Sequence, residues 1–331
     1  MPGFWILSAN SWMQTPAGHE MRDGIAFPVS WIGVIFNPSF PYRFAHMMTA
    51  AYLTTSLVVL AVGARYLLVR AFETEARTMM RMGVGMLAVL GPLQLLIGDQ
   101  HGLNTLEHQP AKIAAIEAHW RDEGPADLVL FAWPDERGER NRAEIAIPKI
   151  ASVILTHDPN GRVPAMTDFP REARPPVAPP FFAFRIMVGI GLLLIAIGLA
   201  GAFLWWRKRL FDSRWYLRIT GYAWPAGFVA ILAGWVTTET GRQPYIAYGI
   251  LRTADAISPV AAGTVAASFA AFVVVYCVVF SIGIYYIRKL IRRGPQGAAV
   301  APPSTPEALP NRPLSAAQDS TRESRSEGNV I

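Results

Sequence analysis

Charged residues are scarce in this 331-residue chain. Asp, Glu, Lys and Arg together make up 16% of it, against about 25% in a typical soluble protein. Hydrophobic residues make up 52%, so much of the chain must lie in something other than water. Only four of the 30 basic residues are lysines, and the basic residues stand between apolar runs. This is the topology pattern of a membrane protein rather than a nucleic-acid-binding face. We therefore predict an all-α, polytopic transmembrane bundle with no nucleic-acid partner.

Cysteine is almost absent as well. The single Cys277 lies inside an apolar run, which excludes a disulfide framework and a cysteine-based metal site. The chain also has no P-loop and no GxGxxG, HExxH or GxSxG motif. The sequence therefore gives no support for the enzyme classes that these motifs identify.

Five apolar runs approach or exceed the roughly 20 residues that a helix needs to cross a bilayer. They cover residues 44–64, 82–98, 186–206, 219–238 and 256–287. The second is short and contains Pro92, which a membrane helix tolerates. A sixth run opens the chain, is too short to span, and lacks the features of a signal peptide. We interpret residues 1–14 as the remnant of a transmembrane helix in a truncated chain.

The basic loops predict the orientation, because short loops rich in Lys and Arg stay in the cytoplasm. Such clusters follow the first, third and fifth runs, at residues 65–81, 207–218 and 288–293. Residues 99–180 then face outward, with 13 acidic residues against nine basic ones. In order along the chain we predict the helix remnant (1–14), an outer loop followed by two spans (15–98), the outer loop region (99–180), three spans (181–293) and a disordered cytoplasmic tail (294–331).

The outer loop region carries local structure signals of its own. Residues 110–121 read as a short helix that begins at a proline. Two strand-like runs, 128–133 and 143–147, flank a polar turn, which predicts a β-hairpin. The proline-rich stretch 170–180 is typical of an extended lead into the next span.

Two polar side chains inside the spans are candidate haem ligands. His46 lies a few residues past Pro41, and Met187 lies a similar distance past Pro180. The predicted topology places both at one depth near the outer surface. A His and a thioether can clamp a haem iron, and this ligand pair suits an electron carrier. Taken alone, each residue is more often structural.

Other charged residues have open interpretations. Glu239 ends the fourth span with Trp235 one turn earlier; it can pair with Arg242, ligate a metal or relay protons. Arg185 can balance a haem propionate or act as an interfacial anchor. Lys112 and Glu117 lie five residues apart and can bind the two polar ends of a ligand, although such residues more often form a solvated face. His101 and His108 match no metal spacing.

Taken together, several runs resemble subunit I of the cytochrome bd-type quinol oxidases, over nearly the whole chain up to about residue 290. The matching runs are Trp5–Gly18, Arg43–His46, Gly98–Gly102, Lys112–Trp120, Phe182–Met187 and Glu239–Pro244. The compact 99–180 region is similar to the cyanide-insensitive branch of the family. Two departures stand out. The family's first helices have no counterpart here, and its Gly-Arg-Gln-Pro-Trp motif ends in Tyr245.

The resemblance implies specific roles for these residues. His46 and Met187 would ligate a low-spin haem b, and Arg185 would stabilise its reduced form. Lys112 and Glu117 would belong to the quinol site. Glu239 would ligate a high-spin haem, with Trp235 and Arg242 beside it. The implied cofactors are a low-spin haem b, a high-spin haem b and a haem d, or a haem b in its place.

The implied function is quinol oxidation at the outer face of the bacterial inner membrane, coupled to reduction of oxygen to water. The implied partners are quinol, oxygen, membrane lipid, a second large subunit and possible small accessory subunits. The residues alone leave two alternative functions open. One is a non-catalytic membrane scaffold or transporter fragment, and the other is a truncated oxidase chain that binds only the low-spin haem.

Overall fold

A computed structural model describes residues 2–121, 124–257 and 259–295 of the chain. Most of these residues are helical, and the strands form three short two-stranded antiparallel sheets. The helices are α1 (Pro2–Gln14), α2 (Trp31–Ile35), α3 (Phe40–Leu68), α4 (Glu73–His108), α5 (Pro110–Glu117), α6 (Ile150–Thr156), α7 (Ala178–Trp206), α8 (Arg214–Tyr222), α9 (Ala226–Thr240) and α10 (Ala262–Arg293). The strands are β1 (His19–Arg22), β2 (Ile25–Pro28), β3 (Leu128–Asp135), β4 (Arg140–Ile147), β5 (Tyr245–Ala247) and β6 (Leu251–Arg252).

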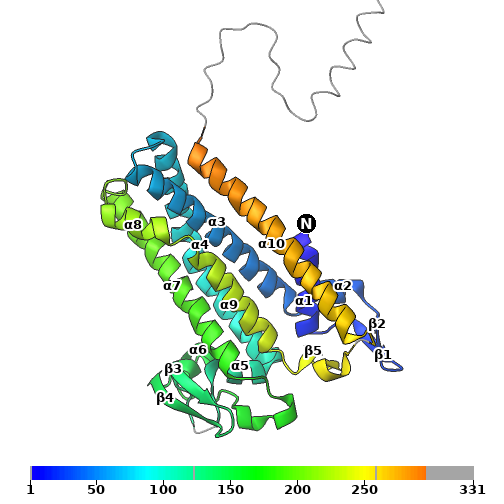
Figure 1. Cartoon of the computed structure of the whole chain (residues 1–331). Coiled ribbons are helices and arrows are strands. Elements are labelled where there is room, and N and C mark those ends of the chain that lie inside the picture. Colours follow the sequence, from blue (N-terminus) through cyan, green and yellow to red (C-terminus); the bar gives the residue numbers. More distant parts are fainter. Residues whose placement is uncertain (1, 122–123, 258, 296–331) are drawn as a thin grey trace, which may run out of the picture. The chain divides into compact units, whose positions relative to one another are not determined.

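Among the described residues, four helices are long and apolar enough to cross a membrane: α3, α4, α7 and α10. The pair α8 and α9 can form a fifth span, bent by 42° at a short break. The break falls at Pro225, which caps α9 and cannot donate a backbone hydrogen bond to α8. The predicted all-α class and multi-pass membrane character are confirmed (Figure 1).

Two predicted boundaries are wrong. The second span was expected to end at residue 98, but α4 continues to His108. Hydropathy detects only the apolar middle of this 36-residue helix, whose polar ends continue the same helical hydrogen bonding. The stretch 170–180 is not extended throughout, since α7 already begins at Ala178 with prolines in its first turn, where their missing N–H costs nothing.

The transmembrane core lies where α3, α4, α7 and α8 meet. Leu57, Leu60, Met80 and Val84 are fully buried there. Small residues let the helices approach closely, as is common in membrane bundles. At Gly83, an added Cβ would lie only 2.7 Å from the Cβ of Leu60.

The segment between α4 and α7 (residues 109–177), which we call the outer segment, has a small core of its own. It contains α5, the β3–β4 hairpin and α6, with Trp120 and Met166 buried among alanines. The indole of Trp120 donates a hydrogen bond to Asn141 at 2.8 Å, which ties the end of α5 to the hairpin. Phe181, at the start of α7, is part of the same core, so the outer segment packs onto the helix that carries Met187.

The chain divides into two compact units, at Val275 and Tyr276, and α10 crosses this division. The cavity and the outer segment belong to the first unit. The predicted tail, residues 294–331, lies outside the described residues except for positions 294 and 295.

Candidate functional site

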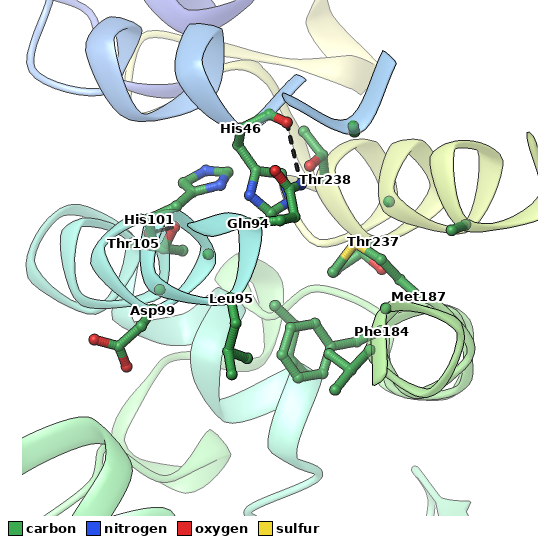
Figure 2. Close-up of a pocket in the computed structure, with 18 of the residues that line it drawn as sticks. His46, Gln94, Leu95, Asp99, His101, Thr105, Phe184, Met187, Thr237 and Thr238 are labelled. Carbon is green, nitrogen blue, oxygen red and sulfur yellow. Dashed lines mark hydrogen bonds between the residues drawn. The ribbon is translucent and has the colours of Figure 1, made fainter. Parts of the chain in front are cut away.

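A cavity of about 430 Å³ lies among α3, α4, α7 and α9, with α5 and α6 of the outer segment beside it. Its lining is mainly apolar, and polar side chains are concentrated in a few places. Figure 2 shows His46 and Met187 facing this cavity from α3 and α7. The structure thus brings together the two side chains that the sequence placed at one depth.

Glycines make room for both candidate ligands. An added Cβ at Gly98 of α4 would lie 3.3 Å from Cε1 of His46. One at Gly234 of α9 would lie 3.0 Å from Sδ of Met187. The Nδ1 atom of His46 is buried and has no hydrogen-bond partner among the described residues. Because buried polar atoms are nearly always hydrogen-bonded, this nitrogen needs a partner that the described residues do not provide.

Arg185 ties the outer segment to α7. Its guanidinium pairs with the carboxylate of Glu117 at 3.3 Å. It also donates to the carbonyl oxygens of Val129 at 2.7 Å and Ile116 at 2.6 Å, and stacks on the ring of Phe181. Burial raises the pKa of Glu117, although Arg185 opposes the shift.

Lys112 is buried as well, with 3% of its surface exposed. Its ammonium donates a 2.6 Å hydrogen bond to Oε1 of Gln14, at the end of α1. Burial lowers the pKa of Lys112 well below its usual range, and the nearby guanidiniums of Arg43 and Arg242 lower it further. The interpretation of Lys112 and Glu117 as a solvated face is therefore wrong: α5 packs against α4 and α7, and Lys112 bonds to Gln14 of α1.

Both carboxylate oxygens of Glu239 accept a hydrogen bond from a neighbouring side chain. Arg242 donates to one carboxylate oxygen at 2.5 Å, and Asn10 of α1 donates to the other at 2.8 Å. Of the three options for Glu239, the structure contains the ion pair. Trp235, one turn earlier, lines the cavity, whereas Glu239 does not.

Sequence reasoning missed two residues of this site. Arg43 is 8% exposed, and its Nε has no hydrogen-bond partner among the described residues. His101 lies beside His46 with ring centroids 5.5 Å apart, and its Nε2 is also buried without a partner in the described part of the chain. His101 was expected in a loop, so only the extension of α4 brings it to the cavity.

The same arrangement of helices occurs in a solved structure, that of bd oxidase from Geobacillus thermodenitrificans. The TM-score is 0.80 at 27% sequence identity, over 88% of this chain and 67% of that one. The family model of cytochrome bd terminal oxidase subunit I matches residues 1–295. The chain belongs to this family. Because the chain belongs to this family, we expect its cofactors to be haems.

Two curated relatives agree with the assignment to the subunit I family. Cytochrome bd ubiquinol oxidase subunit 1 of Bacillus subtilis is 35% identical over 309 residues. Cytochrome bd-II ubiquinol oxidase subunit 1 of Escherichia coli is 30% identical over 365 residues. Each alignment covers 89% of this subunit I chain, but 65% of the first relative and 71% of the second. The chain thus spans about two thirds of their length.

Proposed function

We propose that this chain is a haem-binding subunit of a terminal quinol:oxygen oxidoreductase, which oxidises quinol and reduces oxygen to water. The observation that carries the proposal is the convergence of His46 and Met187 on one cavity. They come from helices far apart in sequence, and one offers an imidazole nitrogen and the other a thioether. This pair of donors suits a low-spin haem iron.

The residues around the cavity fit a haem in a second respect. A haem carries two carboxylates, and a buried N–H group without a partner is available to receive one of them. In the described part of the chain that group is Nε of Arg43, which lines the cavity. Charge-assisted hydrogen bonds of this kind are among the strong ones. Once bound, the haem supplies one-electron transfer.

For the second and third haems, the proposal rests on the family resemblance. Both carboxylate oxygens of Glu239 already accept hydrogen bonds, and this side chain stands outside the cavity lining. Its assignment as ligand of a high-spin haem b, and the presence of a haem d, stay predictions of the family resemblance. The same holds for Trp235 and Arg242 as neighbours of that haem.

Quinol is proposed to bind where α5 borders the cavity. Lys112 and Glu117 both line it, and they offer a hydrogen-bond donor and an acceptor to the two oxygens of a quinol head group. Glu117 is the candidate proton acceptor, because burial raises its pKa and so makes its carboxylate a stronger base. Arg185 holds that carboxylate in place from α7.

The remaining proposals concern the assembly. We propose the bacterial inner membrane as the location, with the outer segment on the extracytoplasmic side as the basic loops predict. A second large subunit and small accessory subunits are the proposed protein partners, and lipid surrounds the bundle. A scaffold or transporter role is not favoured by the family match. A chain that binds the low-spin haem without turnover is the rival to test.

The test is a reduced-minus-oxidised absorption spectrum of membranes that contain the chain with its second subunit. We expect a low-spin b-type signal that is lost in His46→Ala and in Met187→Leu. The matched control is Met82→Leu, because Met82 is 62% exposed on α4 and lies outside the cavity. A signal that survives in Met187→Leu contradicts the ligand assignment. A normal signal without quinol oxidation favours the rival.

A further inference from the structure

One face of the β3–β4 hairpin is apolar and exposed. Phe131 and Trp133 of β3 are 47% and 63% exposed, and Ile145 of β4, which stands opposite Phe131 in the register, is 60% exposed. We call these three side chains the apolar face. Val129 and Ala132 of β3 are instead buried in the core of the outer segment. An exposed cluster of large apolar side chains outside the transmembrane helices marks a contact with an apolar partner or with the membrane.

The apolar face continues the exposed side of α7. The ring of Phe182, in the second turn of α7, has its centroid 6.2 Å from that of Phe131 and 5.9 Å from that of Trp133. Ile186 and Leu193 follow Phe182 at helical spacing on the same side of α7, and they are 48% and 45% exposed. Because α7 is a candidate membrane span, lipid is the expected neighbour of this side. Figure 1 shows the hairpin beside the start of α7, so the two apolar surfaces adjoin.

The depth of Phe182 corresponds to the head-group layer of a bilayer. α7 ends at Trp206, and the basic run 207–209 marks the membrane surface at that end. A hydrocarbon core about 30 Å thick takes about 20 residues of helix, so its other edge lies near residue 187. Phe182 then lies about 7 Å outside the hydrocarbon core. Trp133, which contacts it, is of the residue type enriched in this layer, because an indole is apolar with one polar N–H group.

Two hydrogen bonds hold the hairpin in this orientation. Arg185 of α7 donates to the carbonyl oxygen of Val129, near the start of β3, at 2.7 Å. The backbone N–H of Val177 donates to the carboxylate of Glu136, just past the end of β3, at 2.8 Å. Because both ends of β3 are joined to α7 or to the residue before it, the apolar face keeps its place beside this span.

We propose that the apolar face of the β3–β4 hairpin inserts into the head-group layer of the bilayer beside α7, and so attaches the outer segment to phospholipid. Arg142, which stands opposite Trp133 in the register and is largely exposed, lies at the rim where phosphate groups are found. The proposal is independent of the proposed function, because no candidate haem or quinol residue belongs to the apolar face.

The test measures the surroundings of single nitroxide spin labels in the assembled complex, in nanodiscs of phosphatidylethanolamine and phosphatidylglycerol. Cys277→Ser removes the only cysteine of this chain, and cysteines of the second subunit are replaced by serine. Phe131→Cys or Ile145→Cys then carries the label. We expect both labels to be accessible to oxygen, which concentrates in lipid, and shielded from a water-soluble nickel chelate. Two sites on facing strands keep the test decisive if one substitution disturbs the hairpin.

Glu144 provides the matched control. It directly precedes Ile145 and is exposed, and consecutive residues of a strand point to opposite faces. Its carboxylate accepts a hydrogen bond at 2.7 Å from Asn141, which also bonds to Trp120 of the core. A label at Glu144→Cys should therefore be open to the nickel chelate.

Two results would overturn the proposal. Access of the nickel chelate to labels at Phe131 and Ile145, equal to its access at Glu144, means that the apolar face meets water. Shielding of these labels from both oxygen and the nickel chelate means that a protein surface covers the face instead of lipid.

Discussion

Removing the Arg185 side chain should release the outer segment from the membrane bundle. In Arg185→Met, the carboxylate of Glu117 loses its ion pair at 3.3 Å. The carbonyls of Ile116 and Val129 lose donors at 2.6 and 2.7 Å. Breaking a buried pair by removing one partner costs about 3–5 kcal/mol. The Arg185 side chain keeps 17% of its exposure, so we expect the low end, about 3 kcal/mol.

A cost of about 3 kcal/mol raises the open population of the outer segment roughly 100-fold. Tryptic cleavage within this segment, in the solubilised complex, measures that population when opening is fast relative to cleavage. The control is Glu117→Gln, which keeps the shape of the side chain and leaves Arg185 its carbonyl acceptors. It should cost about 1 kcal/mol, and so raise cleavage only about fivefold. Cleavage of Arg185→Met at the unsubstituted rate would refute this account of the segment's attachment.

Two further predictions follow from local geometry. Gly98→Ala should shift the low-spin haem signal, because its new Cβ meets the His46 ring at 3.3 Å; Gly85→Ala on the same helix meets nothing within 4 Å and should leave the signal unchanged. In the hairpin, a hydrogen bond from Arg142 holds the pKa of Asp135 below its usual range. The stabilisation that this carboxylate gives is therefore present above the ordinary pKa and lost as the pH falls below about 4. Amide exchange of the hairpin against pH should show the loss in the native chain, and a flatter profile in Asp135→Asn.

Much of the fold could be predicted from the sequence, because hydropathy reports directly which stretches can lie in lipid. The apolar runs located the spans to within a few residues where the helix and its apolar part coincide, as at both ends of α3 and at the end of α7. They failed for α4, whose polar ends continue the helix on both sides. The hairpin was predicted from its alternation and its polar turn, and the structure extends each strand by a few residues.

The candidate site was only partly predictable. The prediction that His46 and Met187 lie at one depth came from counting along the chain, because each follows a proline near the start of its span. Their convergence on one cavity depends on how α3, α4, α7 and α9 pack. For Lys112 and Glu117 the residues alone left a ligand site or a solvated face open, with the solvated face the commoner case, and only the resemblance placed them in a quinol site. Both are buried.

The sequence by itself indicated the solvent of each segment and the side of the membrane that the basic loops favour. It also predicted five spans, where the described residues have four candidates and a bent pair that can form the fifth. These follow from the transfer of single residues between water and lipid, which depends on composition and local order. The tertiary structure alone decided which distant side chains meet: Glu117 with Arg185, Gln14 with Lys112, and His101 with His46. Such pairs are set by helix packing, in which small residues fix how closely and in which register two helices approach. The local sequence around one residue of such a pair does not predict which residue of a distant segment it will contact.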